Sequence, residues 1–396
     1  MNIKQLTGGV FYVGVNDRTT VHFEGLWDLP KGVSYNSYIV AGEKTALIDT
    51  VAIGSIGEYL ANVLSVTDSV DYLIVNHMEP DHSGALPEIA ARFPGLRIVA
   101  DKIAIGMIKG FYGITDESRF LEVKDGDTLD LGGGKLLSFH LTPMVHWPET
   151  MMTYLASEQM LFSGDAFGTF GALNGAVTDD RCDVDYYEAE MRRYYAAIVG
   201  KYSPFVQKAL KKLAGLPLGY ICSTHGPVWH REIARIVDIY DRMSRQETEE
   251  GVVIVYGSMY GNTGKLVDSL AVAMNQEGVD KVRVFNAGET GLSFILSEVW
   301  RYKGLIVASP TYSMDLFPPV EAFMKAIEIR EMKNHVGAAL GSFAWAPGIA
   351  AKKIEERMAA LGMPLVGRYS MKMAPDASSD TALKQIAVEM AAAVKA

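Results

Sequence analysis

The 396-residue sequence predicts an α/β protein built from two domains. Short β-type runs separated by turns fill residues 8 to about 165, and strand and helix alternate regularly in the last third of the chain. Between these regions, the polar stretch "SRQETEEG" at residues 244–251 interrupts both patterns. We therefore expect a sandwich of sheets covered by helices over residues 1–249 and a doubly wound parallel sheet over residues 250–396.

The strands of the first part are short and end in turn residues. Helices are expected near residues 54–66, 84–93 and 101–110, then at 184–214 and 231–246. The expected strands are "VFYVGV", "SYNSYIVA", "KTALIDTV", "VDYLIVNH", "LRIVAD", "KLLSFHLT" and "MMTYLA". Strands paired by hairpins, with helices outside them, favour a sandwich.

The second part begins with "VVIVYGS", an almost continuously apolar run that is typical of a strand buried on both faces. Further strands are expected in "VRVFNA", "GLIVASP", "HVGAALGSF" and "PLVGRYSMK". Helices are expected near residues 263–277, 291–301, 318–328, 348–361 and 379–395. This alternation predicts a parallel sheet with helices on both faces.

The composition limits the possible functions. A net charge of −10 argues against non-specific binding to nucleic acid. Two cysteines, Cys182 and Cys222, are too few for a disulfide framework or for a cysteine-ligated iron–sulfur or rubredoxin-type centre. No apolar run approaches the roughly 20 residues that span a bilayer, and the N-terminal residues lack the features of a signal peptide. We expect a cytoplasmic protein that does not bind membranes.

Potential metal ligands follow several apolar strands of the first part. The stretch "YLIVNHMEPDHSGALPEIA" runs from a strand into a turn that carries His77, Glu79, Asp81 and His82. Three further candidates occupy comparable strand ends: His146 in "TPMVHWPET", Asp165 in "LFSGDAFG" and His225 in "CSTHGPVW". A single histidine of this kind is more often a core residue, and a single aspartate is usually a turn former. The whole set would be costly to bury unless a metal compensated its charge.

A loop in the second part has the character of a phosphate-binding site. "VVIVYGSMYGNTGK" places a strand, a loop and a helix start in succession, and a helix N-terminus favours an anion. The spacing differs from that of a Walker A loop and from G-x-G-x-x-G. The candidate residues are Ser258, Met259, Tyr260, Gly261, Asn262 and Thr263.

Two later loops follow core strands at their carboxyl ends, where open α/β sheets bind ligands. The first, "SPTYSMDLFPP", contains Pro310, Thr311 and Tyr312. The second, "GSFAWAPG", contains Ser342, Phe343, Ala344 and Trp345. The three loops resemble those with which flavodoxins bind FMN, and the resemblance implies that the later two enclose the flavin ring. Tyr312 or Trp345 could stack on that ring, although core packing explains a single aromatic residue equally well.

The ligand spacing resembles the H-x-H-x-D-H pattern of the metallo-β-lactamase fold, an αβ/βα sandwich with a two-metal site, but Glu79 replaces one histidine. Sites rich in imidazole suit zinc, whereas mixed histidine and carboxylate sites suit redox-active iron. The pattern H-x-E-x-D-H, together with "MVHWPETMMTYL", "FSGDAFG" and "STHGPVW", resembles the flavodiiron proteins (class A) along essentially the whole chain. The resemblance implies a C-terminal flavodoxin-like domain that binds FMN.

The resemblance also implies how the ligands divide between two irons. His77, Glu79 and His146 would hold one iron, and Asp81, His82 and His225 the other. Asp165 would bridge them, alongside an oxo or hydroxo group. His82 is the ligand on which family members differ.

The chain departs from the family pattern at three positions. Glu24 occupies the place of a histidine that lines the substrate pocket in many members, and Ala344 and Pro347 stand where glycines are common. Glu24 leaves the preference between dioxygen and nitric oxide open. Tyr195 is a candidate hydrogen-bond donor behind the ligands, with packing in the core as the alternative role.

The resemblance implies an oxidoreductase that reduces dioxygen to water, nitric oxide to nitrous oxide, or both. Four electrons are needed to reduce one dioxygen, and two ferrous ions with one reduced flavin supply four. A rubredoxin or a reduced deazaflavin would be the electron donor. A head-to-tail homodimer, which could pair further into a tetramer, would bring each flavin beside the irons of the other subunit.

Two other functions are consistent with the sequence. The first is a zinc hydrolase of the metallo-β-lactamase fold with a flavodoxin-like appendage, against which Glu79 argues. The second is an electron-transfer or flavin-storage module whose metal site is redundant.

Overall fold

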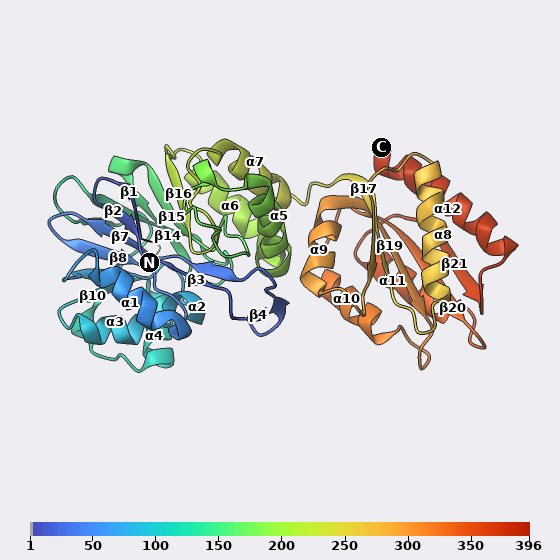
Figure 1. The fold of residues 1–396 in the computed structure, drawn as a ribbon, viewed down its shortest axis with the longest axis horizontal. Helices are drawn as coiled ribbons and strands as arrows, with labels where there is room; N and C mark the ends of the chain where they lie inside the picture. The colour runs from blue at the N-terminus through green and yellow to red at the C-terminus, as the bar shows by residue number, and fades with distance from the viewer. Residues whose placement is uncertain (1–2) are drawn as a thin grey trace. The chain divides into compact units, whose positions relative to one another are not determined.

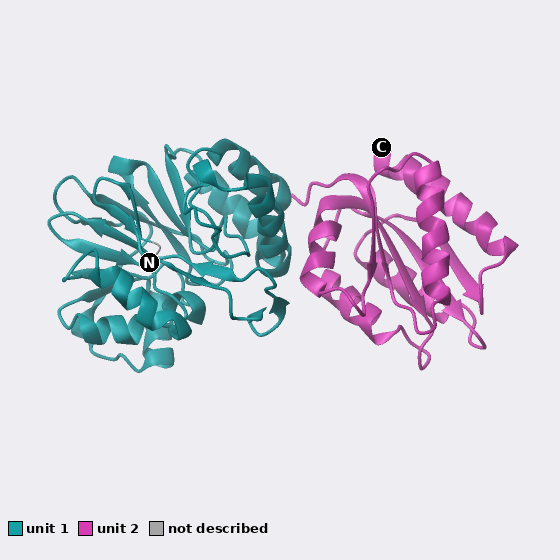
Figure 2. Cartoon of the chain, in the orientation of Figure 1, with its two compact units in different colours: residues 1–244 teal, residues 245–396 magenta. Residues whose placement is uncertain are grey.

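The computed structural model describes residues 3–396, which form two compact units, residues 1–244 and 245–396 (Figures 1 and 2). The units divide after Ser244, whereas the sequence places the domain boundary at 249/250. Residues 245–249 therefore fall in the second unit, whose first strand, β17, spans Glu249–Tyr256. None of the helices that the structure describes is both long enough and apolar enough to span a bilayer.

The larger sheet of the first unit has seven strands in the order β1-β2-β7-β8-β9-β10-β11. β1, β2 and β7 pair antiparallel, and β8 to β11 run parallel. The strands are β1 (Lys4–Thr7), β2 (Val10–Tyr12), β7 (Tyr38–Ala41), β8 (Thr45–Ile48), β9 (Tyr72–Ile74), β10 (Arg97–Ala100) and β11 (Phe120–Glu122).

The second sheet of this unit has the order β12-β13-β14-β15-β16. Its strands are β12 (Thr128–Asp130), β13 (Leu136–Leu141), β14 (Met151–Leu155), β15 (Met160–Gly164) and β16 (Tyr220–Ser223). All residues of β14 and β15 are buried, because both faces of these strands are covered. Two further antiparallel sheets have two strands each and pair β3 (Val15–Asp17) with β6 (Val33–Tyr35) and β4 (His22–Phe23) with β5 (Trp27–Asp28).

Two groups of helices accompany these sheets. Figure 1 shows α1 (Ile56–Leu64), α3 (Leu86–Arg92) and α4 (Lys102–Tyr112) gathered at one side of the unit. The other group contains α5 (Val184–Tyr194), α6 (Ser203–Leu213) and α7 (Ile233–Ser244). The helical region expected at 184–214 is helical throughout, but a π-helical turn (Tyr195–Val199) and a 3-10 turn (Gly200–Tyr202) separate α5 from α6.

The second unit is a five-stranded parallel sheet in the order β18-β17-β19-β20-β21. Its later strands are β18 (Val282–Asn286), β19 (Tyr302–Pro310), β20 (Val336–Phe343) and β21 (Leu365–Lys372). The helices are α8 (Asn262–Gln276), α9 (Leu292–Arg301), α10 (Pro318–Ile329), α11 (Ile349–Ala360) and α12 (Ala377–Lys395). Figure 1 shows α8 beside α12 on one side of the sheet and α9 with α10 on the other. The strand order changes direction between β17 and β19, and ligands bind at the carboxyl ends of such strands.

Candidate metal centre and second pocket

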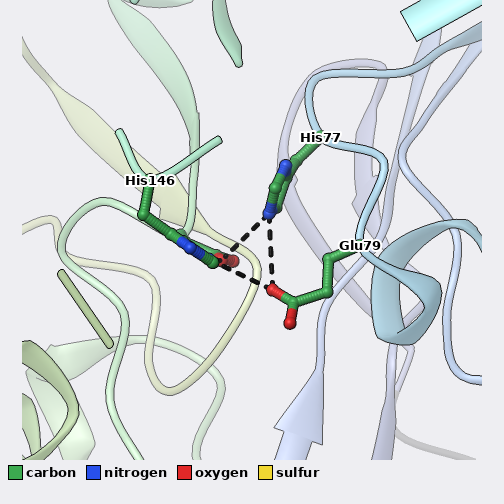
Figure 3. A group of neighbouring side chains, drawn as sticks. His77, Glu79 and His146 are labelled. Atoms are coloured by element: carbon green, nitrogen blue, oxygen red, sulfur yellow. Dashed lines mark hydrogen bonds and ion pairs between the residues drawn. The ribbon is translucent and has the colours of Figure 1, made fainter. Parts of the chain in front are cut away.

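Four buried side chains from three segments of the first unit form the first ligand group: His77, Glu79, His146 and Asp165. Figure 3 shows how the first three of them point toward one another. His77 and Glu79 lie in the turn after β9, His146 lies in the loop before β14, and Asp165 directly follows β15. Glu79 Oε2 lies 3.4 Å from His77 Nε2 and 3.1 Å from His146 Nε2. Asp165 Oδ2 lies 3.6 Å and 3.0 Å from the same two nitrogens. The four donor atoms thus face one common point.

The second ligand group consists of Asp81, His82 and His225. Asp81 Oδ1 lies 3.2 Å from His82 Nε2, and Asp81 Oδ2 lies 3.2 Å from His225 Nε2. The other oxygen of Asp165, Oδ1, lies 2.8 Å from His82 Nε2 and 3.7 Å from His225 Nε2. Asp165 therefore presents one oxygen to each group, as a carboxylate that bridges two metal ions would.

Unpaired buried atoms show that these side chains fit metal ions. His77 Nε2, His82 Nε2, His225 Nε2 and both carboxylate oxygens of Asp81 are buried without a hydrogen-bond partner. Leaving one such atom unsatisfied costs about 1–3 kcal/mol, and more when the group is charged. A cation coordinated by these atoms would remove the cost. Histidine mixed with carboxylate is the donor set that suits iron.

The protonation of the metal-free groups follows from their mutual contacts. Burial opposes charge on Glu79, but the hydrogen bond from His146 and the nearby His77 prevail and hold the pKa of Glu79 below its usual range. Burial also opposes charge on His146, but Asp165 and Glu79 raise the pKa of His146 to about 9. The negative charges of Asp165 and Asp81 likewise prevail over burial and raise the pKa of His82 to about 9. Metal binding must therefore displace protons from these histidines.

Two of the candidate ligands are held from behind by polar groups. His77 Nδ1 lies 2.8 Å from Glu149 Oε1, which also accepts a hydrogen bond of 2.9 Å from the amide of Met78. His225 Nδ1 lies 2.7 Å from the carbonyl oxygen of Ser34. In both rings the Nε2 atom is thereby left to face the centre. Glu149 was not predicted from the sequence, although its position three residues after His146 and two residues before an apolar strand was the available signal.

A second pocket of about 350 Å³ lies in the second unit, at the carboxyl ends of β17, β19 and β20. The three predicted loops meet there, and Thr263 Oγ1 lies 2.9 Å from Ser342 Oγ. Gly261, with φ of 90°, lets the loop turn into α8, and its amide donates to Ser258 Oγ at 3.1 Å. The pocket is lined by Ser258, Met259, Tyr260, Asn262, Thr263, Pro310, Thr311, Ser342, Phe343, Ala344, Trp345 and Met373. Of the predicted residues, Gly261 and Tyr312 flank this lining, and Met373 was not predicted.

The lining of this pocket suits a phosphorylated aromatic ligand. Hydroxyl groups and the start of a 15-residue helix can bind a phosphate without a basic side chain. Aromatic side chains stand at the rim, where Tyr260 is 92% and Trp345 79% exposed. Exposed aromatic faces of this kind can stack on a flat ring.

Comparison with known proteins agrees with both sites. The family model of the ODP family beta lactamase matches residues 33–226, and the flavodoxin model matches residues 254–386. An anaerobic nitric oxide reductase flavorubredoxin from Pectobacterium atrosepticum is 34% identical over 377 residues, which cover 93% of this chain and 73% of the relative. The chain belongs to the flavodiiron protein family.

Solved structures of flavodiiron proteins have the same fold. The rubredoxin oxygen:oxidoreductase from the anaerobe Desulfovibrio gigas superposes with a TM-score of 0.94, at 32% identity and over 100% of this chain and 99% of that one. The flavodiiron protein from Giardia intestinalis gives a TM-score of 0.93 at 25% identity, over 100% of this chain and 97% of that one. The expected αβ/βα sandwich followed by a flavodoxin-like domain is therefore confirmed.

Two tyrosines of this flavodiiron protein differ in how they relate to the ligand groups. The hydroxyl of Tyr195 lies 2.8 Å from Ser203 Oγ, and its ring meets that of Tyr240 edge-on at 5.0 Å. The ring of Tyr194 lies 5.4 Å from that of His225, and its buried hydroxyl has no hydrogen-bond partner. The structure thus places Tyr194 at the ligands and directs Tyr195 into the helical core.

Glu24, which departs from the family pattern, lies in the turn between β4 and β5. Its Oε2 accepts a hydrogen bond of 3.0 Å from Trp27 Nε1. Glu24 is exposed, yet desolvation by the surrounding protein, followed by the charge of Glu79, raises the pKa of Glu24 to about 7. The flavodiiron centre of this chain therefore has an additional carboxyl group beside Glu79.

Proposed function

We propose that this flavodiiron protein reduces dioxygen to water, nitric oxide to nitrous oxide, or both, with electrons that an external donor supplies through FMN. The observation that carries the proposal is the position of Asp165, with one oxygen facing each of two buried ligand groups. Each group contains two histidines and one carboxylate of its own. Such an arrangement suits two redox-active metal ions that are held close together by one shared carboxylate.

We assign the ligands as follows. His77, Glu79 and His146 would hold one iron, Asp81, His82 and His225 the other, and Asp165 would bridge them with an oxo or hydroxo group. FMN would bind in the second pocket, with its phosphate at the start of α8 and its ring between the two later loops. When bound, the irons and the flavin supply the electrons that the reduction of dioxygen or nitric oxide requires.

The chain's own residues hold the centre in place. The carbonyl of Ser34 and the carboxylate of Glu149 fix the rings of His225 and His77, so that their Nε2 atoms remain directed inward. The buried ligands exclude bulk water, which favours controlled transfer of protons and electrons. Glu24, with its pKa near neutrality, is a group at the centre that can hold a proton at pH 7.

We further propose that the protein is cytoplasmic and forms a head-to-tail homodimer in which each flavin lies beside the irons of the other subunit. Two such dimers could pair into a tetramer. The exposed aromatic rim of the second pocket supports a covered interface at that surface. A rubredoxin or a reduced deazaflavin would donate the electrons. Rubredoxin is part of the name of the similar Desulfovibrio protein, the rubredoxin oxygen:oxidoreductase.

Turnover measured with substrate-specific electrodes tests the proposed reaction. Anaerobically purified protein with reduced rubredoxin is expected to consume dioxygen, nitric oxide or both over many cycles. His146→Ala, which removes a ligand, should lower turnover by at least about 100-fold. His140→Ala is the matched control, because this histidine contacts Ser138 on β13 and belongs to neither ligand group. Both variants should retain FMN, whose pocket lies in the other unit.

Two outcomes would contradict the proposal. A single reoxidation by oxygen without turnover would identify an electron-transfer or flavin-storage module. Hydrolytic activity with zinc at both positions would identify a hydrolase.

A further inference from the structure

The two ligand groups supply the same charge to their metals, yet their outer surroundings differ. Each group has two imidazoles and one carboxylate of its own, and they share Asp165. The directly bound ligands therefore do not distinguish one iron from the other. Any difference in how readily the two irons are oxidised must arise from the groups behind the ligands.

A charged carboxylate, that of Glu149, lies behind the first group. Glu149 is 1% exposed, and its Oε1 lies 2.8 Å from His77 Nδ1, while its Oε2 is buried without a hydrogen-bond partner. An imidazole that donates to a carboxylate gains electron density and passes it to the metal. Buried negative charge also stabilises the ferric over the ferrous ion, because little solvent is present to screen it.

Among the described residues, the hydrogen-bond contact behind the second group comes from a neutral group. His225 Nδ1 meets the carbonyl oxygen of Ser34 at 2.7 Å, and His82 Nδ1 is buried without a hydrogen-bond partner. The other buried carboxylate nearby, Asp49, receives two hydrogen bonds from Asn76 and interacts electrostatically with both His82 and His77. The charge of Asp49 acts on His82 more than on His77, but its hydrogen bonds go to Asn76 and not to either ring, so Asp49 does not act through a ligand as Glu149 does.

The bridging carboxylate adds a second asymmetry in the same direction. Thr224 Oγ1 donates a hydrogen bond of 2.6 Å to Asp165 Oδ1, the oxygen that faces the second group. A hydrogen bond withdraws electron density from an oxygen donor and weakens its donation to a metal. Asp165 Oδ2, which faces the first group, has no such donor other than the candidate ligand His146.

We infer that Glu149 and Thr224 make the two irons inequivalent, so that the iron held by His77, Glu79 and His146 is oxidised first. Both are positioning residues that act through a ligand. The inference rests on the proposed di-iron centre and assigns a distinct role to each of its halves. One electron leaves the pair in each of two steps, and the first step belongs to the iron in front of Glu149.

A redox titration followed by EPR and Mössbauer spectroscopy tests this assignment on the intact, iron-loaded protein. Glu149→Gln removes the charge but keeps the shape and an acceptor for His77 Nδ1. It should raise the potential of the first one-electron step and leave the second nearly unchanged. Thr224→Val removes the hydroxyl but keeps the shape, and it should lower the potential of the second step. Each variant should therefore narrow the gap between the steps and reduce the population of the mixed-valent pair.

The possible results separate this inference from the proposed function. Unchanged potentials in both variants, each with two irons bound, would overturn the inference but leave the di-iron centre intact. If Glu149→Gln instead shifted the potential of the second step, the charge of Glu149 would act on the iron that is oxidised second, and the inference would be overturned as well. If Glu149→Gln binds fewer than two irons, the test rests on Thr224→Val: a lower potential of its second step supports the inference, and an unchanged potential overturns it. Wild-type protein without two irons would instead contradict the proposed function.

Discussion

The carboxylate of Asp165 is charged despite complete burial, and the reason lies in its neighbours. Burial would raise its pKa, but His82 and His146 prevail and hold the pKa of Asp165 well below its usual range. Such a concentration of opposite charges in the interior is costly unless each partner is satisfied. The unpaired atoms of His225 and Asp81 show that the protein alone does not satisfy them all.

Tyr194 and Tyr195 are neighbours in the chain, but the first contacts a candidate ligand and the second packs in the helical core, and substitutions can test this difference. Tyr194→Phe removes a buried hydroxyl that has no hydrogen-bond partner, so stability should stay constant or rise. Tyr195→Phe removes the hydrogen bond to Ser203 and should cost about 1 kcal/mol. Urea unfolding of both variants measures the difference. Turnover should fall in Tyr194→Phe and remain in Tyr195→Phe, and the reverse pattern would contradict the placement of these side chains.

The candidate metal ligands could be singled out in the sequence because their spacing and their positions at strand ends are local features. Glu149 shares a segment with His146, but nothing in the sequence shows that its carboxylate contacts the ring of His77, 72 residues earlier. Tyr194 was missed for another reason. The turn at Tyr195–Val199 has π-helical hydrogen bonds, which shift the helix face relative to a regular period of 3.6 residues.

At the level of elements, the second unit agrees closely with the sequence pattern. All five predicted strands and all five predicted helices are present, because continuous apolar runs such as that of β19 identify buried parallel strands. Elements of the first unit were harder to predict. Its strands β1, β11 and β12 have only three or four residues and alternate weakly, so they were not predicted.

The start of β20 supplies a prediction about pH. His335 is buried, its Nε2 donates to the carbonyl oxygen of Val299 at 2.7 Å, and burial lowers its pKa. The unfolded state therefore binds a proton more readily, so the contribution of His335 to stability is present above the unfolded pKa of about 6.5 and is lost as pH falls through the lower folded value.

Thermal unfolding of the full chain between pH 5 and pH 8 checks this effect. The transition of the second unit should move to lower temperature below about pH 6.5. His335→Gln keeps a donor for Val299 but does not titrate, so the decline should be smaller in this variant. An identical pH profile in both proteins would show that His335 is not the group responsible.

At the scale of the whole molecule, each unit contains one of the two candidate sites. The first unit collects its ligands from segments that are far apart in the chain, from His77 to His225, at the ends of strands in both sheets. The second unit collects three loops at one end of a single sheet. Both arrangements depend on apolar strands that end in polar residues, and this pattern made the two sites visible in the sequence.

The most direct test of the central claim is the metal content per chain, measured by mass spectrometry on protein prepared without oxygen. The donor set of histidines and carboxylates predicts about two irons per chain in the wild type. Asp165→Asn, which weakens the shared ligand, should bind less iron. Two zinc ions per chain with little iron, in protein from cells grown with ample iron, would contradict the account.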